Sequence, residues 1–455
     1  MSETLEKAPK ETTPSAPTLK QAFWYWLKLG FISFGGPAGQ IAIMHKDLVE
    51  DKRWISEQRF LHALNYCMVL PGPEAQQLAT YIGWLMHKTR GGLIAGGLFV
   101  LPSLLILILL SAIYMRYGNT PVVAGVLYGI KPAVVAIVLF AAYRIGSRAL
   151  KNKALWAIAF ASFCAITLLK LPFPVIIIAA AVIGYLGNGL APNIFSDKND
   201  HKNSQKTQSK FSGKAVIDDD TPTPAHAHFS WRSFFKFLLI GIAIWLAGMV
   251  TLTAILGWQA IYTQMAWFFT KAALLTFGGA YAVLPYMFQA AVTHYGWLTP
   301  TQMMDGLALG ETTPGPLIMV VAFVGFVGGW GHAELASPLV SAVLAACIVT
   351  FFTFLPSFIF IFMGAPFIES TKNNLKLTAP LNAITAAVVG VIVALALFFA
   401  LHVFWPNGDF SQLMQIDWLA ALAAALGFVA LFKFKVSTIR LIGVFALFGL
   451  AHSLL

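Results

Sequence analysis

The sequence predicts an all-α polytopic membrane protein built from two inverted-topology repeats, with broken or re-entrant helices and one central linking helix. Of the 455 residues, 58% are hydrophobic and 11% are charged, whereas roughly 25% of the residues of soluble domains are charged. Three apolar stretches, at residues 93–114, 122–143 and 388–403, approach or exceed the roughly 20 residues with which a helix crosses hydrocarbon. The chain is therefore expected to cross a lipid bilayer several times.

The chain resembles itself after a shift of 243 positions, and this alignment holds without gaps over about forty residues. The residues paired in this way are Lys28 with Lys271, Phe34, Gly35 and Gly36 with Phe277, Gly278 and Gly279, Trp54 with Trp297, and Pro71, Gly72 and Pro73 with Pro314, Gly315 and Pro316. Farther along, the matching residues are Leu101, Pro102 and Ser103 with Leu355, Pro356 and Ser357. The expected segments are a disordered N-terminal tail without a signal peptide (1–20), a first repeat (21–192), a hydrophilic, solvated linker (193–230), an inverting transmembrane helix (231–257) and a second repeat (258–455).

Positive charge predicts opposite orientations for the two repeats, because loops rich in Lys and Arg stay in the cytoplasm. The basic loops of the first repeat contain Lys88 and Arg90, and Arg144, Arg148, Lys151 and Lys153; the matching regions 328–336 and 405–417 contain no Lys or Arg. The second repeat instead has Lys372, Lys376, Lys433 and Lys435 in loops whose first-repeat counterparts hold only Arg116 and Lys170. The N-terminus and linker are expected in the cytoplasm, and the C-terminus on the outer side of the cell inner membrane.

Four crossings are expected in each repeat, which in the first are at 92–115, 121–148, 154–169 and 174–190. An even number would leave the two repeats parallel, so the central helix is needed to invert the second. Inverted repeats are the architecture of many secondary transporters, which bind their substrate near the bilayer midplane. The alternative is a duplication retained only for packing.

Glycine or proline interrupts four short apolar segments, two in each repeat. A fourteen-residue helix covers only about 21 Å of a hydrocarbon core of about 30 Å, so these segments are expected to enter, break and return. Irregular backbone is tolerated at membrane depth only where it is buried in protein or lines a cavity. The helix that follows each break directs a partial positive charge at the gap, which is suited to an anion. The alternative is that these residues merely kink the helices.

Polar residues near the breaks are the candidate site. Lys271 lies within the apolar run 265–275, and because a lysine at membrane depth costs roughly 2.5–3.5 kcal/mol, it is either functional or extends its amine to the interface. The candidate anion-binding residues are Lys28, Gly35, Gly36, Pro37, Gln40, Pro71, Gly72, Pro73, Gln76, Gln77, Lys271, Thr276, Gly278, Gly279, Pro314, Gly315 and Pro316. Glu74 and Glu311 are the candidates for proton coupling, with helix capping as the alternative.

At these residues the chain resembles the chromate ion transporter family, and the resemblance extends over almost the whole chain. The strings that carry it are FGGP from Phe34, LPGPEAQQLATYIGW from Leu70, TFGGAYAVLP from Thr276 and TPGP from Thr313. The resemblance implies a long, two-domain chromate efflux protein driven by the proton gradient or the membrane potential, with sulfate as a close chemical analogue. The second repeat has Leu317, Ile318 and Met319 in place of EAQQ, so a symmetric role for Glu74 is not expected.

Other functional classes lack their motifs. The sequence contains no HExxH, no GxxxxGK[ST] loop and no metal-ligand spacing among Cys67, Cys164 and Cys347, so no metal, cofactor or catalytic residue is expected. Basic residues flank apolar spans, which argues against a nucleic-acid partner. The expected partners are an oxyanion and the bilayer, and a homo-oligomer is left open. Uptake or exchange of sulfate or another small oxyanion, an enzyme acting on lipid phosphates and a membrane scaffold are the alternatives.

Overall fold

The computed structural model describes residues 14–34, 36–118, 120–190, 214–219, 221–222, 224–277, 280–332, 337–370, 378–405 and 416–454. Every regular element in these residues is helical, apart from one isolated bridge between Ile55 and Ile217. The all-α expectation is therefore confirmed for this part of the chain.

The first half of the chain begins with short helices and continues with longer ones. Its elements are α1 (Leu19–Ile32), α2 (Gly36–His45), the π-helix η1 (Lys46–Asp51), α3 (Glu57–Val69), α4 (Glu74–Tyr117), α5 (Pro121–Ala149), α6 (Lys153–Thr167) and α7 (Phe173–Leu190). The start of α1 follows from its sequence, because Thr18 and Gln21 form a capping box in which each side chain bonds the other residue's backbone N–H. Ser56 caps α3 by accepting a hydrogen bond from Arg59 N–H.

In the second half, short helices again precede longer ones after a long apolar helix. Its elements are the 3-10 turn η2 (Ala225–Ala227), α10 (Trp231–Leu256), α11 (Ile261–Leu274), α12 (Ala280–Phe288), the π-helix η3 (Gln289–His294), α13 (Pro300–Thr312), the 3-10 turn η4 (Leu317–Met319), α14 (Val320–Gly331), α15 (Pro338–Ser370), α16 (Thr378–Phe404), α17 (Trp418–Phe432) and α18 (Thr438–Leu454). A second capping box, between Thr299 and Gln302, starts α13.

α4 is a helical hairpin, not one straight helix. His87 and Lys88 leave the helical conformation, with φ of −133° and +57°. A Cβ on Gly83 would come within 2.5 Å of the Ala95 Cβ and of the Gly91 carbonyl oxygen, so the arms on either side of the turn run antiparallel in close contact. The long arm covers the expected crossing at 92–115, whereas the short arm before His87 returns from the second break.

Within the described ranges, five helices, α4, α5, α10, α15 and α16, are long and apolar enough to cross a membrane. α10 exposes apolar side chains, among them Leu239, Val250 and Ile255, as expected of a helix in contact with lipid. α6 and α17 each have 15 residues, which at 1.5 Å per residue gives about 22 Å. Their role as full crossings stays a prediction.

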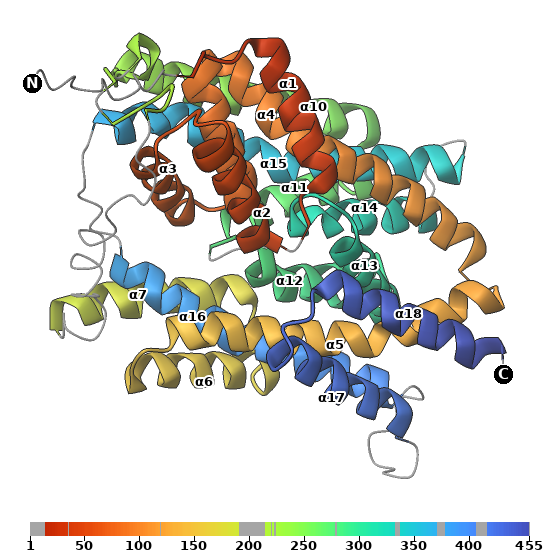
Figure 1. Cartoon of the computed structure of the whole chain (residues 1–455). Coiled ribbons are helices and arrows are strands. Elements are labelled where there is room, and N and C mark those ends of the chain that lie inside the picture. Colours follow the sequence, from red (N-terminus) through yellow and green to blue (C-terminus); the bar gives the residue numbers. More distant parts are fainter. Residues whose placement is uncertain are drawn as a thin grey trace, which may run out of the picture.

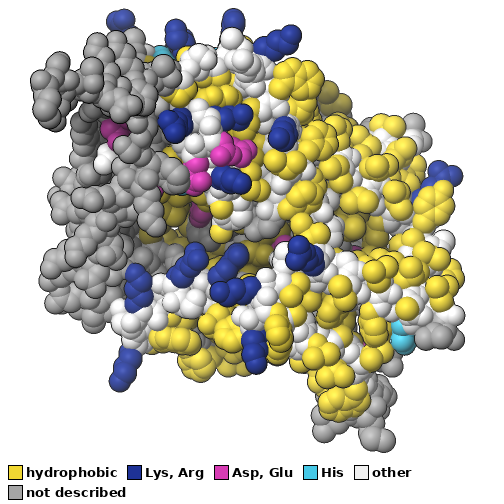
Figure 2. All heavy atoms as spheres, viewed as in Figure 1, with side chains coloured by type: hydrophobic (Ala, Val, Ile, Leu, Met, Phe, Trp, Pro, Cys, Tyr) yellow, Lys and Arg dark blue, Asp and Glu magenta, His cyan; other side chains and the backbone are white. Residues whose placement is uncertain are grey.

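The helices form two bundles, which lie one above the other in Figure 1. The upper bundle contains α1, α4, α10, α11, α14 and α15, and the lower bundle contains α5, α6, α7, α16, α17 and α18. Between them, α12 contacts α16 and α13 contacts α5. On the face shown in Figure 2, a furrow separates the bundles, and Lys and Arg side chains gather along its lower margin. Each bundle thus contains helices from both halves of the sequence.

The linker is not fully solvated, which corrects the expectation for its described C-terminal part. Ile217 and Ala227 are buried, and Ile217 N–H donates to the Trp54 carbonyl at 3.1 Å. Arg59 Nη2 also donates to the Thr221 carbonyl at 2.6 Å. Ile217 pairs with Ile55 in the loop before α3, and the η2 turn that contains Ala227 packs on α15. The remainder of the expected linker, at 193–213, lies outside the described residues.

Candidate anion-binding site

The broken helices meet in two pairs, and each pair joins the two halves of the chain. Gly315 N–H donates to the Ser33 carbonyl at 2.8 Å, and Gly72 N–H donates to the Thr276 carbonyl at 2.8 Å. Gly72 and Gly315 have φ of +127° and +103°, a region that glycine alone adopts at little cost. The second break of each half is therefore held against the first break of the other half.

Two serines lie against these glycines. A Cβ on Gly315 would be 2.7 Å from the Ser103 Cβ, and a Cβ on Gly72 would be 2.5 Å from the Ser357 Oγ. Both serines are buried, with 0% and 1% of their surface exposed, and Ser103 Oγ has no hydrogen-bond partner among the described residues. These serines were not among the predicted site residues, although the repeated Leu-Pro-Ser string was a signal for them.

Three buried glutamines support the breaks through their amide nitrogens. Gln40 Nε2 donates to the Gly315 carbonyl at 2.5 Å, Gln77 Nε2 to the Pro71 carbonyl at 2.8 Å, and Gln76 Nε2 to Thr80 Oγ1 at 3.0 Å. The bonds of Gln40 and Gln77 stabilise the irregular backbone at the two breaks, whereas that of Gln76 stays within α4; a role of the three glutamines in anion binding stays a prediction.

Several buried polar atoms of the breaks remain without a partner in the described part of the chain, namely Ser33 Oγ, Ser103 Oγ and the Oε1 atoms of Gln40, Gln76 and Gln77. Buried polar groups are normally hydrogen-bonded, so these atoms are available to a ligand or to water. The two hydroxyls can donate to an oxyanion, whereas the amide oxygens can only accept from water or from a protonated oxyanion. The first turn of α4, which starts at Glu74, adds its partial positive charge.

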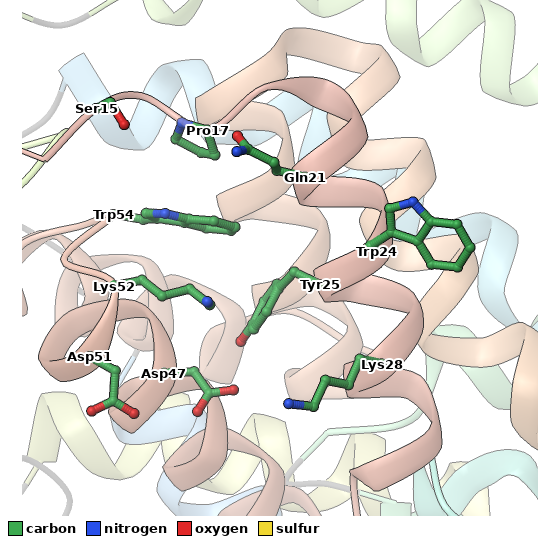
Figure 3. A pocket seen from close by; sticks show the side chains of 10 residues that line it. All are labelled: Ser15, Pro17, Gln21, Trp24, Tyr25, Lys28, Asp47, Asp51, Lys52 and Trp54. Atoms are coloured by element: carbon green, nitrogen blue, oxygen red, sulfur yellow. The ribbon is translucent and has the colours of Figure 1, made fainter.

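The two predicted lysines are not hydrogen-bonded to the breaks in the described residues. Lys28 is exposed and lines a separate pocket of about 660 Å³, in which its amine points toward Asp47 and Tyr25 (Figure 3). Lys271 is partly exposed, and its Nζ lies 5.3 Å from the centre of a Trp267 ring. A role for either lysine in substrate binding stays a prediction.

The remaining predicted residues fall into three groups. Gly36 has φ of +71° and begins α2, while Pro37 follows it in the first turn; Gly35, Gly278 and Gly279 lie outside the described residues. Gly72 lies between Pro71 and Pro73, and Gly315 lies between Pro314 and Pro316. Of the proton-coupling candidates, Glu74 is partly buried beside Pro73, and Glu311 is buried and accepts a 2.6 Å hydrogen bond from the Tyr281 hydroxyl.

A family model described as chromate transporter matches the chain twice, at residues 20–185 and 263–450. The chain belongs to the chromate transporter family. This confirms the resemblance and makes the protein a multi-pass membrane transporter, not an enzyme. A chromate transport protein of Cupriavidus metallidurans is 29% identical over 435 residues, which cover 94% of this chain and 93% of the relative. A chromate transport protein of Pseudomonas aeruginosa is 31% identical over 396 residues, which cover 85% and 82%.

An uncharacterized transporter of Methanocaldococcus jannaschii is 26% identical over 401 residues, which cover 88% of each chain. No solved structure matches the chain significantly. The relatives thus span nearly the same length as this member of the family.

Proposed function

We propose that this family member is a secondary active transporter that exports chromate across the inner membrane, driven by the proton gradient or the membrane potential. The observation that carries the proposal is the pair of crossed contacts, Gly315 to Ser33 and Gly72 to Thr276, around which hydroxyl groups are buried without partners. The relatives named chromate transport proteins supply the substrate class. The basic margin of the furrow in Figure 2 would attract an anion from solution.

The chemistry of the breaks suits a tetrahedral dianion. Such an ion loses its water shell on entry, so it needs several hydrogen-bond donors in its place. Serine hydroxyls, the backbone N–H groups of irregular loops and a helix N-terminus can all donate hydrogen bonds to the oxygens of such an ion. Their fixed positions on packed helices reduce the entropy lost on binding.

We also propose that the two halves are inverted repeats that alternate access to this site. α3 (Glu57–Val69) and α13 (Pro300–Thr312) have bounds shifted by 243 positions, as do η1 (Lys46–Asp51) and η3 (Gln289–His294). The same shift relates Ser33 to Thr276 and Gly72 to Gly315, the residues of the two crossed hydrogen bonds. Movement of the lower bundle against the upper one would open the site to one side at a time.

Substrate-resolved flux in vesicles tests this function. The purified protein is reconstituted, and the fluxes of chromate, sulfate, molybdate and phosphate are compared under an imposed membrane potential and under a pH gradient. We expect chromate flux that depends on one of these gradients. Sulfate flux without chromate flux would favour the alternative substrate, and no flux of any oxyanion would contradict the proposal.

Ser103→Ala tests the site itself. The variant removes a hydroxyl that lies against Gly315, and a hydrogen bond to a charged group contributes about 1.5–3 kcal/mol, so chromate affinity is expected to fall roughly 10- to 150-fold. Ser162→Ala in α6 is the matched control, since Ser162 is also buried but α6 packs on α16 and α7. Equal chromate binding by the two purified variants would exclude Ser103 from the site.

A further inference from the structure

Asp305 of α13 is a buried carboxylate that the sequence analysis did not single out. Only 3% of its surface is exposed. Its Oδ2 accepts a hydrogen bond from the Tyr114 hydroxyl at 2.9 Å, while its Oδ1 has no hydrogen-bond partner among the described residues. A carboxylate buried in a membrane protein is costly and is by default a functional candidate.

The charged side chain that interacts with Asp305 is a lysine of α5. Lys131 of α5 attracts the carboxylate electrostatically, but the two side chains form no direct ion pair in the described part of the chain. Among the other elements packed on α13, η4 and α14 contain no ionisable side chain, whereas α4 contributes Tyr114 and also carries the charged residues Glu74, Lys88, Arg90 and Arg116. The ionisable residues of α16 and α18 are His402, Arg440 and His452, whereas the side chains that interact with Asp305 are Lys131 and Tyr114. Asp305 thus faces one tyrosine and one lysine, with a free oxygen.

Buried hydroxyls lie along α4 between the residue that bonds Asp305 and the residue that contacts the break at Gly315. Ser103, Ser111 and Tyr114 lie on one side of the long arm of α4, because they are spaced by eight and three residues. Ser103 contacts the position of Gly315, Ser111 is buried with an unpartnered Oγ, and Tyr114 bonds Asp305. α13 also carries Asp305 and leads directly into the break at Gly315. The polar side chains from Ser103 to Asp305 thus begin and end on elements that form the site.

We propose that Asp305 binds a proton together with the oxyanion, so that proton and substrate move through the same state of the transporter. This inference rests on the proposed function. The proton comes from water and bonds to Oδ1, the oxygen without a partner, while Oδ2 keeps the hydrogen bond from Tyr114. Protonation removes a negative charge that would repel the oxyanion and leaves the charge of Lys131 uncompensated, so the proton and the anion strengthen each other's binding.

The sign of this linkage decides the driving force. A dianion that moves with one proton still carries net negative charge. A membrane potential that is negative inside drives such a charge outward, whereas an inward proton gradient opposes the accompanying proton. The membrane potential is therefore the driving force of export in this scheme.

The test is chromate binding to the purified protein between about pH 5 and pH 9, with proton uptake measured in weak buffer. Parent affinity should rise as pH falls, by a factor in the usual range for coupled sites, about 5- to 150-fold. Asp305→Asn imitates the protonated carboxyl and can keep the Tyr114 hydrogen bond. It should bind as tightly as the parent at low pH, with a much smaller pH response and one proton fewer taken up. Protonation of chromate itself affects both proteins equally and cancels in the comparison.

Two further variants separate coupling from a structural role. Tyr114→Phe removes a donor that stabilises the charged carboxylate, so the midpoint of the pH response should move to higher pH. Asp51→Asn alters an exposed carboxylate and should leave the response unchanged. Equal pH responses in the parent and Asp305→Asn would overturn the inference alone. Absence of oxyanion binding by the parent at any pH would overturn the proposed function as well.

Discussion

Two constraints, a positive φ and a close neighbour, require glycine at both Gly72 and Gly315. Their positive φ angles disfavour any side chain, and a Cβ would meet Ser357 and Ser103 at contact distances that real atoms do not adopt. Because the N–H of each glycine is bonded to the other half of the chain, displacement of its backbone would also displace the opposite break. The geometry of the candidate site thus depends on the absence of two methyl groups.

Gly315→Ala should lower chromate affinity about tenfold or more. The added methyl group would displace the Ser103 hydroxyl, and moving one hydrogen-bond donor out of reach of a charged ligand costs about 1.5–3 kcal/mol. Gly296→Ala is the matched control, because Gly296 also has positive φ (+64°) but a Cβ there would meet nothing within 4 Å. The backbone strain differs between the two variants, because φ of +64° lies in the left-handed region, where a side chain costs roughly 1–2 kcal/mol, whereas φ of +103° lies outside that region. Direct binding to purified protein is the measurement, and equal affinities would mean that the Gly315 contact does not shape the site.

For single residues, the sequence identified the glycines and prolines at the breaks but not where the side chains around them point. The pairing of Pro-Gly-Pro with the other half was not foreseen, because the alignment relates equivalent positions and not contacting ones. Lys271 shows why the direction of a side chain is hard to predict. Its apolar neighbours suggested a cation at the break, but the long, flexible lysine side chain reaches Trp267 one turn away, and its amine lies over that ring.

Helix packing provides the next level of organisation. In the lower bundle, α5 and α18 approach so closely that a Cβ on Gly449 would lie 2.5 Å from the Gly129 backbone nitrogen and 2.6 Å from its Cα. Small residues allow such contact between backbones, and in lipid this packing supplies much of the association energy. α5 also carries Lys131 and contacts α13, so its position affects the environment of Asp305.

Gly449→Ala is expected to destabilise the lower bundle by about 1–3 kcal/mol, the usual cost of adding an atom to a tightly packed contact. Gly443→Ala provides the control on the same helix, since a Cβ at Gly443 would meet nothing within 4 Å. Unfolding of both variants in a detergent titration measures the difference. Similar stabilities would show that α18 shifts to accommodate the methyl group.

The composition of the sequence predicted where helices begin and end, but it did not predict turns inside a helix. The apolar run at 92–115 predicted the long arm of α4, and the break at 71–73 predicted its start. The turn at His87 and Lys88 was missed because Lys88 adopts φ of +57° without being glycine or proline. Gly83 and Gly91 lie in close contact across that turn, and such a contact cannot be inferred from the local sequence.

For the whole molecule, three contacts bear on orientation. His87 Nε2 lies 2.9 Å from the Pro17 carbonyl, and His226 Nε2 lies 3.1 Å from the Trp84 carbonyl. The segment preceding α1, the end of the linker and the turn next to Lys88 and Arg90 are thus at one end of the structure. His452, near the end of α18, stacks on Tyr128 in the first part of α5, with ring centres 5.2 Å apart.

These contacts, together with the charge pattern, predict that the linker and the end of α18 are on opposite sides of the membrane. The long arm of α4 leads away from Lys88, and α5 starts where that arm ends, so Tyr128 and the end of α18 belong to the far end from the basic turn. Since basic turns stay in the cytoplasm, reporter fusions after Gln205 and after Leu455 should report cytoplasm and exterior, respectively. Substituting Lys88 and Arg90 by Gln should weaken this preference, because it removes two of the charges that set it. Both parent fusions on one side would contradict the inverted arrangement of the halves.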